Sequence, residues 1–177
     1  MSFIKTYESP FGTMYMRSDG KYLTGLWFKD SRDSSKHIGD HEEKNLPVFE
    51  ETGEWLDIYF SGKIPDFTPE YKVENLTPFR QQVIDIMNKI PYGKVTTYHN
   101  IAAEIAKIRG LEKMSAQAVG GAVGWNPICI VIPCHRVVGT NGSLVGYGGG
   151  IQNKVRLLEL EKNDMSRFTI PKKGTAL

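Results

Sequence analysis

The apolar run Ile130-Val131-Ile132 ends at Pro133, and a chemically reactive side chain, Cys134, follows at once. Consecutive β-branched residues favour a buried strand, and Pro133 must end its ladder because proline has no N–H to donate. Cys134 is therefore expected where the chain leaves a sheet, a common position for functional side chains. In a regular strand the next residue would point to the opposite face, so cooperation between the two requires a break after Pro133 or a bridging water.

A cysteine reacts as its thiolate, and with an ordinary pKa of about 8.5 it needs a base or a positive charge nearby. His135 and Arg136 follow Cys134 directly and meet this need. The other cysteine, Cys129, lies five residues earlier, and an extended run would separate the two Cα atoms by about 16 Å. A disulfide tolerates no more than about 7 Å, so a bridge would require the predicted strand to be wrong. Cys129 is expected to be an inert thiol.

The sequence indicates neither a metal site nor a membrane segment. Beyond His135, the histidines form no paired ligand spacing, so we expect no structural zinc (His37, His41 and His99). No apolar run approaches the roughly 20 residues of a membrane-spanning helix. The N-terminus has no signal-peptide core, and we therefore expect a cytoplasmic protein.

The charges divide the chain into two parts. Residues 1–75 carry a net charge of −5 and residues 76–177 carry +7, which together give the +2 of the whole chain. This asymmetry predicts two domains, of which the second binds a polyanion such as nucleic acid. An uneven solvated surface is the alternative explanation.

The first part combines strands with a helix and contains no catalytic constellation. Phe11–Arg17 and Tyr22–Phe28 are strand-like, and Asp19-Gly20 between them is typical of a hairpin. The polar stretch Asp30–Asn45 predicts a surface loop. Apolar residues at helical spacing predict an amphipathic helix over Pro47–Ser61. We expect this part to have a supporting role.

The second part is mainly helical. Thr77 and Pro78 are suited to the start of a first helix, and Pro91-Tyr92-Gly93 ends it. A short strand, Lys94–Thr96, precedes a second helix whose apolar residues begin at Tyr98. Ser115 is positioned to cap a third helix. Short helices joined by a tight turn predict a helix-turn-helix that offers its third helix to DNA.

That third helix contains Gly120, Gly121 and Gly124, each of which costs about 1 kcal/mol relative to alanine in a helix interior. Two explanations are open: a ligand or DNA approaches the backbone closely, or the helix packs tightly on its neighbours. The loop 139–150 also holds six glycines. It lacks the Gly-Lys-Ser/Thr of a phosphate loop, so it is interpreted either as the wall of a pocket, with Tyr147 as an aromatic face, or as a flexible surface loop.

The final predicted helix, Ile151–Lys162, places an acid on its apolar face. At about 100° per residue, Glu161 falls between Leu157 and Leu158, whereas Glu159 faces solvent. A carboxylate in such a position needs a partner. A relay from Glu161 to His135 to Cys134 would orient the imidazole and draw the proton from the thiol. A surface salt bridge with a lysine such as Lys154 is the alternative.

The ordered segments AVGGAVGWNP, IPCHRVVG and GYGGG, at residues 118–127, 132–139 and 146–150, resemble the O6-alkylguanine-DNA alkyltransferases, or methylated-DNA–protein-cysteine methyltransferases. The resemblance covers residues 76–165 closely and residues 9–28 more loosely. It implies an α+β fold: a ribonuclease H-like domain over residues 1–75, then a mainly helical winged helix-turn-helix domain over residues 76–177.

The resemblance also implies a single-turnover repair reaction. Cys134 would accept the alkyl group from O6-alkylguanine in double-stranded DNA after base flipping, without a cofactor, and a monomer is expected. O4-alkylthymine stays open as a second substrate. His135 would act as base through a water, Glu161 would orient it, Asn126 would brace the turn, and Tyr98 would hydrogen-bond the base.

The remaining site residues are also taken from the resemblance. The base pocket would be lined by Val137, Tyr147, Gly148 and Gly149, and DNA would be bound by Thr97, Ser115, Gln117, Ala118, Gly121 and Arg136. Two departures stand out: Gln117 occupies the usual place of an arginine that fills the gap left by the extruded base, and Gly148 replaces a frequent serine. The first suggests weaker DNA affinity or slower extrusion.

Two other functions compete with this interpretation. A cysteine hydrolase with a Cys-His-Glu triad would turn over repeatedly and would need an oxyanion hole, for which Asn126 is the one evident donor. A non-catalytic helix-turn-helix regulator would leave Cys134, His135 and Glu161 without a purpose.

Overall fold

The computed structural model describes residues 1–32 and 39–171, which divide into two compact units. The first unit comprises residues 1–75 together with 127–131, and the second comprises residues 76–126 together with 132–177. The division into domains over residues 1–75 and 76–177 stays a prediction. In the structure, the stretch 127–131 clusters with the first unit.

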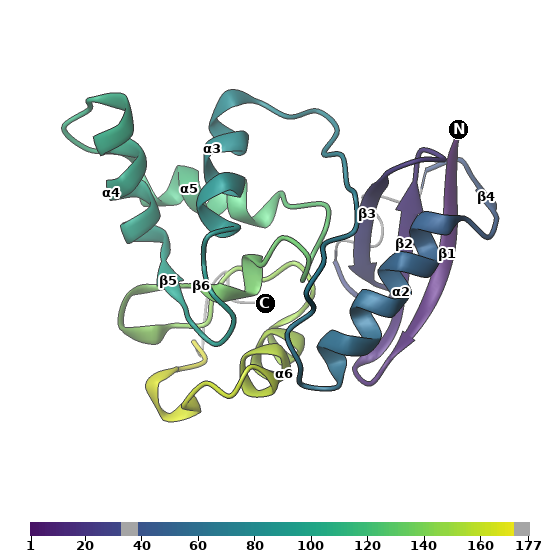
Figure 1. Ribbon diagram of the computed structural model, residues 1–177. Helices are drawn as coiled ribbons and strands as arrows, with labels where there is room; N and C mark the ends of the chain where they lie inside the picture. Colours follow the sequence, from purple (N-terminus) through teal and green to yellow (C-terminus); the bar gives the residue numbers. More distant parts are fainter. Residues whose placement is uncertain (33–38, 172–177) are drawn as a thin grey trace. The chain divides into compact units, whose positions relative to one another are not determined.

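The first unit is a four-stranded sheet with one helix. The strands are β1 (Ser2–Ser9), β2 (Gly12–Ser18), β3 (Leu23–Phe28) and β4 (His41–Glu43), in the order β3-β2-β1-β4. Neighbouring strands are antiparallel except for β1 and β4, which are parallel. Helix α2 (Pro47–Phe60) packs against β1, β2 and β3 (Figure 1). The predicted hairpin and helix are confirmed.

Two features of this unit differ from the sequence-based expectation. Strand β1 was not predicted, and β4 lies within the stretch Asp30–Asn45 that was predicted to be a loop. All three residues of β4 are exposed, so no apolar alternation marks them as a strand. Residues 33–38 of that predicted loop lie outside the described residues.

The second unit is built on the helices α3 (Pro78–Met87), α4 (Tyr98–Arg109) and α5 (Ala116–Gly124), which pack on one another (Figure 1). Thr77 caps α3 by accepting a hydrogen bond from the Arg80 N–H, and Pro78 takes the first helical position. Helix α4 ends at Gly110, whose φ of 67° is the left-handed conformation that glycine tolerates best. The three predicted helices and their order are confirmed.

The rest of the second unit holds the chemistry-bearing segments. Strands β5 (Thr96–Thr97) and β6 (Val137–Val138) pair in parallel, and the turns η1 (Cys134–Arg136), η2 (Thr140–Gly142) and η3 (Met165–Arg167) are short 3-10 helices. Helix α6 (Ile151–Leu160) contributes to a hydrophobic cluster with Val138 and Leu144. The α+β fold class, with a sheet domain followed by a helical domain, is confirmed.

The predicted buried strand before Cys134 is wrong in its geometry, although its burial is correct. Ile130, Val131 and Ile132 are all buried. However, Ile130 has a φ of 68°, and the Val131 N–H donates to the Cys129 carbonyl at 2.8 Å, which closes a tight turn. Ile128 forms an isolated bridge with Leu26, and the Cys129 N–H donates to the Leu26 carbonyl at 3.0 Å. Both cysteines are nevertheless free thiols.

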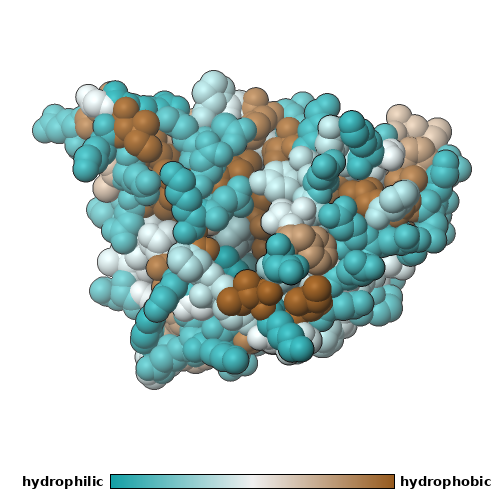
Figure 2. All heavy atoms as spheres, in the orientation of Figure 1, coloured by the Kyte–Doolittle hydropathy of each residue, from teal (hydrophilic) through white to brown (hydrophobic). Residues whose placement is uncertain are grey.

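Most large hydrophobic side chains are buried, and a few lie on the surface. Ile108 and Leu111, at the end of α4, are 62% and 48% exposed, and hydrophobic atoms are visible on the tip of this helix (Figure 2). Among residues 1–32 and 39–171, no helix has both the length and the apolar character that crossing a membrane requires.

Candidate active site

The turn η1 presents Cys134 immediately after Pro133, so the break that the sequence required is present. The Asn126 side-chain amide, buried beside it, donates to the Ile132 carbonyl at 2.9 Å. The Arg136 N–H donates to the Pro133 carbonyl at 3.0 Å and closes the turn. The sequence predicted that Asn126 braces this turn, and the structure places its side chain against the residue before Pro133. Cys134 itself is 8% exposed.

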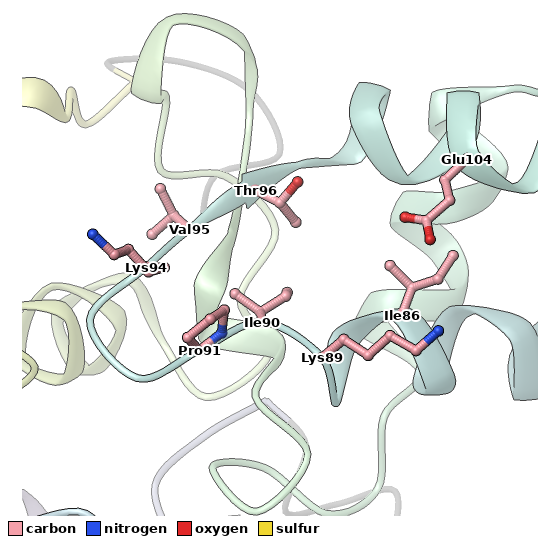
Figure 3. A pocket seen from close by; sticks show the side chains of 8 residues that line it. All are labelled: Ile86, Lys89, Ile90, Pro91, Lys94, Val95, Thr96 and Glu104. Carbon is pink, nitrogen blue, oxygen red and sulfur yellow. The ribbon is translucent and has the colours of Figure 1, made fainter.

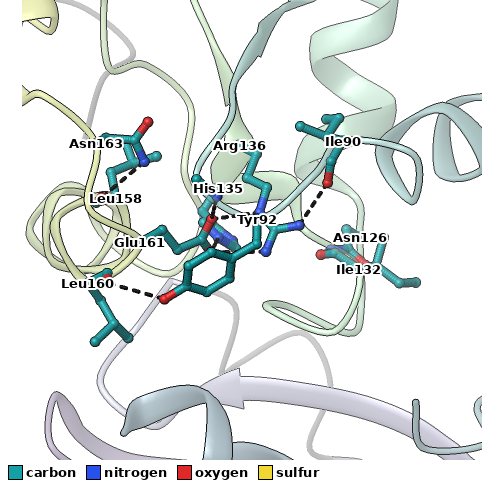
Figure 4. Close-up of polar contacts among 11 residues, drawn as sticks. Ile90, Tyr92, Asn126, Ile132, His135, Arg136, Leu158, Leu160, Glu161 and Asn163 are labelled. Carbon is teal, nitrogen blue, oxygen red and sulfur yellow. Dashed lines mark hydrogen bonds and ion pairs between the residues drawn. The ribbon is translucent and has the colours of Figure 1, made fainter. Parts of the chain in front are cut away.

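His135 and Glu161 are in direct contact, as the relay hypothesis predicts. His135 Nε2 lies 2.6 Å from Glu161 Oε2, and both side chains are fully buried (Figure 4). Glu161 comes directly after α6, where its backbone N–H still bonds to the Leu157 carbonyl. The alternative, a surface salt bridge between Glu161 and Lys154, is not what the structure contains, since both residues are buried.

Arg136, predicted to bind DNA, has a different partner. Its Nε and Nη2 donate to the two carboxylate oxygens of Glu161 at 2.8 and 3.1 Å, and its Nη1 donates to the Ile90 carbonyl at 2.8 Å (Figure 4). The arginine side chain is 12% exposed. Because its guanidinium is engaged by Glu161 and Ile90, a DNA-contacting role for Arg136 is not carried forward.

The Glu161 carboxylate is anchored further by the turn that follows α3. The Gly93 N–H donates to Glu161 Oε1 at 3.0 Å. Gly93 has a φ of 78°, and a Cβ there would lie 3.1 Å from the Glu161 carbonyl oxygen. Both the left-handed conformation and the close approach favour glycine. Sequence reasoning gave this glycine a helix-stopping role and missed its contact with Glu161.

The pKa values of the pair set their charges near neutral pH. Burial lowers the pKa of His135 below its ordinary 6.5, against the opposing hydrogen bond and charge of Glu161. Burial acts to raise the pKa of Glu161, but the hydrogen bonds from His135 and Arg136 and the positive charge of Arg136 outweigh it and hold that pKa well below its usual range. Glu161 is therefore a carboxylate and His135 a neutral imidazole. With Nε2–H donated to Glu161, Nδ1 is the ring nitrogen able to accept a proton.

Tyr98 and the loop after β6 close over this region. Tyr98 Oη donates to the Val145 carbonyl at 2.9 Å, so its hydroxyl is engaged by the protein's own backbone. The predicted pocket residues on this loop, Tyr147, Gly148 and Gly149, are buried, as is Val137. Burial and the charge of Cys134 both raise the pKa of Tyr98, so this residue stays protonated at neutral pH.

The outer face of α5 is bare. Gln117, Ala118 and Gly121 are exposed. A Cβ added at Gly121 or Gly124 would meet no atom within 4 Å, and one at Gly120 would reach only a Tyr98 ring carbon at 3.8 Å. Tight packing therefore does not explain the glycines of this helix. A small-residue surface that its own protein leaves uncovered is what close approach by another molecule requires.

Two other predicted DNA-binding residues cap helices. The Thr97 hydroxyl accepts from the Asn100 N–H at 3.0 Å at the start of α4, and the Ser115 hydroxyl accepts from the Ala118 N–H at 3.1 Å at the start of α5. Ser115 is exposed and Thr97 half-buried. Their side chains thus fix the beginnings of the two helices that form the helix-turn-helix.

A separate hollow of about 210 Å³ lies between the end of α3, β5 and α4 (Figure 3). It is lined by Ile86, Lys89, Ile90, Pro91, Lys94, Val95, Thr96 and Glu104, and Cys134 is not among these residues. Within residues 1–32 and 39–171, no group of three or more His, Cys, Asp or Glu side chains is arranged to hold a metal ion.

The chain matches two family models. The 6-O-methylguanine DNA methyltransferase ribonuclease-like domain matches residues 3–71, and the DNA-binding domain of the same family matches residues 78–163. Among curated proteins, the methylated-DNA–protein-cysteine methyltransferase of Mycobacterium leprae is 36% identical, over 93% of this chain and 95% of that protein. The protein of the same name from Methanosarcina barkeri is 39% identical over 89% of this chain and 96% of its own length.

Solved structures agree with these matches. The OGT of Mycobacterium tuberculosis in complex with DNA superimposes with a TM-score of 0.77 at 36% identity, over 94% of both chains. The O6-methylguanine-DNA methyltransferase of Pyrococcus kodakaraensis gives a TM-score of 0.55 at 25% identity, over 91% of this chain and 99% of that one.

Proposed function

Because this chain belongs to the methylated-DNA–protein-cysteine methyltransferase family, we propose that it repairs DNA by transferring the alkyl group of O6-alkylguanine to its own Cys134. The observation that carries the proposal is the buried His135–Glu161 pair, 2.6 Å across, on the turn that presents the thiol. Family membership disfavours both the hydrolase and the regulator, since each would use this turn differently or not at all.

The reaction is a displacement at the alkyl carbon. His135 Nδ1 takes the thiol proton, directly or through a water molecule, and Glu161 balances the imidazolium that results. The thiolate attacks the alkyl carbon, a C–S bond forms as the C–O6 bond breaks, and the electron pair stays on guanine, which is protonated as it leaves. The thioether is stable, so each protein molecule reacts once.

Double-stranded DNA is the partner, and the damaged base must leave the stack. Cys134 is only 8% exposed, so an O6 substituent within a stacked duplex cannot reach it. The bare face of α5, with Gln117, Ala118 and Gly121, is proposed to enter the minor groove, which is about 6 Å wide in B-DNA. Base entry then requires the loop around Val145 to move and the Tyr98 hydroxyl to exchange the Val145 carbonyl for the base.

The proposal also includes the residues around Cys134, the contacts with DNA phosphates and the state in which the protein acts. Asn126 holds the turn, and Val137, Tyr147, Gly148 and Gly149 line the base pocket. The positive charge of residues 76–177 favours phosphate contacts, which make affinity depend on salt. A monomer without a cofactor, acting in the cytoplasm, completes the proposal.

The test is the intact mass of the protein after incubation with a duplex that contains O6-methylguanine. We expect a gain of one methylene group in the wild type and in Cys129→Ala, and none in Cys134→Ala. Cys129 is the matched control because it is the second buried free thiol, 6% exposed. A mass gain that survives Cys134→Ala, or none in the wild type, would reject the proposal.

A further inference from the structure

Lys154 is a buried lysine to which the repair reaction as described assigns no role. It lies on α6 and its side chain is fully buried. Its Nζ donates to the Val137 carbonyl at 2.7 Å and to the Val145 carbonyl at 3.1 Å. It also lies 5.9 Å from the centre of the Tyr98 ring. Carbonyl groups satisfy its hydrogen bonds but do not neutralise its charge.

The two cations near the site differ in how their charges are balanced. Arg136 is paired with the Glu161 carboxylate through two hydrogen bonds. Within residues 1–32 and 39–171, Lys154 forms no ion pair with a carboxylate. An ammonium group buried without a counter-charge is costly, so a buried lysine of this kind requires either a negative partner or the loss of its proton.

The titratable groups that face Lys154 identify the missing partner. They are Cys134 and His135 on η1, which ends directly before Val137, whose carbonyl binds Lys154 Nζ at 2.7 Å, and Tyr98, whose ring centre lies 5.9 Å from that nitrogen. Burial lowers the pKa of Lys154 to about 8, while the negative charge of Cys134 acts in the opposite direction. His135 is neutral and Tyr98 protonated at neutral pH, as their pKa shifts indicate. The group among these that can supply a negative charge is the Cys134 thiolate.

We propose that Lys154 is a positioning residue for alkyl transfer: its ammonium group is the counter-charge of the Cys134 thiolate and raises the fraction of the thiol that is ionised. Ionisation of Cys134 then creates a neutral pair with Lys154, just as Arg136 and Glu161 form one already. The part of the proposal that concerns alkyl transfer rests on the proposed function, whereas the part that concerns thiol ionisation does not.

The competing explanation is purely structural. Through its two hydrogen bonds Lys154 joins α6 to β6 and to the loop at Val145, so its loss would disturb the pocket wall. A structural role lowers reactivity at every pH. A counter-charge shifts the pH at which reactivity appears, because a pKa change of one unit changes the thiolate fraction about tenfold below the pKa.

The experiment measures the rate at which iodoacetamide alkylates Cys134 as a function of pH. It is done in a Cys129→Ala background, so that Cys134 is the one thiol that can react. We compare Lys154→Gln, which keeps an amide donor, and Lys154→Met, which keeps only the length, with Lys107→Met as the control. Lys107 is an exposed lysine of the same unit, on α4.

We expect the midpoint of the curve of alkylation rate against pH to rise by about one pH unit in both Lys154 variants. Their alkylation rates should be about tenfold lower than that of the wild type near pH 7 and should converge with it at high pH. The control should follow the wild-type curve. Unchanged midpoints with uniformly lower rates would overturn the proposal and leave Lys154 as an anchor.

A second measurement needs no variant and covers the case in which both fail to fold. The Lys154 ammonium is titrated by nitrogen NMR before and after Cys134 is alkylated. Since a thioether carries no negative charge, the pKa of Lys154 should fall on alkylation, and an unchanged pKa would overturn the proposal. Neither measurement uses DNA. If methyl transfer from an oligonucleotide failed, the proposed function would be rejected, but the role of Lys154 in ionising the thiol would still be decided by these two measurements.

Discussion

Replacing Glu161 with glutamine tests the polar cluster behind Cys134. The substitution keeps the size of the side chain and removes its charge. Glu161 accepts hydrogen bonds from His135 Nε2 at 2.6 Å, from Arg136 at 2.8 and 3.1 Å and from the Gly93 N–H at 3.0 Å. A glutamine offers one accepting oxygen, and its NH₂ group would face at least one of these donors.

The expected cost follows from burial. Glu161 is 2% exposed and the Arg136 side chain 12% exposed, so the arginine would lose its counter-charge at a site largely shielded from solvent. Removing one partner of a buried ion pair costs about 3–5 kcal/mol. We expect about 3 kcal/mol, the lower end of that range, because Arg136 keeps its bond to the Ile90 carbonyl. With a urea m value of about 2 kcal/mol/M, the unfolding midpoint should fall by about 1.5 M.

The assay is urea unfolding followed by far-UV circular dichroism, which is dominated by helices, most of which lie in the second unit. Glu159→Gln is the matched control, since Glu159 is exposed on the same helix and should change stability by less than about 0.5 kcal/mol. If Glu161→Gln and Glu159→Gln unfold at the same urea concentration, the reasoning about the buried cluster is refuted.

Four further predictions concern α5 and the effect of acid. Gly121→Ala should raise the free energy of unfolding by about 1 kcal/mol, because helix propensity improves and nothing lies within 4 Å of its Cβ. Gly121→Leu should weaken duplex binding measured by fluorescence anisotropy, and unchanged affinity would argue against groove entry. Gln117→Arg should speed single-turnover repair of duplex DNA or tighten binding, and no gain in either would reject the idea that this glutamine limits extrusion. The folded-state pKa values of His135 and Glu161 both lie below their ordinary 6.5 and 4.5, so the unfolded chain binds protons first on acidification. Urea unfolding at a series of pH values should therefore show stability falling below about pH 6.5 and again below about pH 4.5, whereas a flat profile would contradict the assigned charge states.

The sequence predicted those features that depend on local chemistry. Thr77 and Ser115 cap their helices because a hydroxyl before a helix can accept a hydrogen bond from a backbone N–H three residues on. Glu161 was found because helical periodicity places it on an apolar face, where a carboxylate needs a partner. The relay with His135 followed from that need.

Features that depend on tertiary structure were missed. Ile130 adopts a positive φ that a β-branched residue rarely takes, so the local preference for a strand was overridden. Arg136 was predicted from the resemblance to contact DNA, and its carboxylate partner, 25 residues away in the sequence, was not predicted. Lys154 carried a usable signal, since it lies on the same helical face as Ile151 and Leu158, but its carbonyl partners could not be inferred.

Cys134 is proposed to attack the alkyl group and to retain it permanently, and the most direct measurement of this role counts the guanine released per protein molecule. The protein is incubated with a rising excess of duplex containing O6-methylguanine, and unmodified guanine is quantified after digestion. We expect a plateau at one guanine per protein, with the methyl group mapped to Cys134. Repair that continues beyond one equivalent, or a methyl group found on another residue, would contradict it.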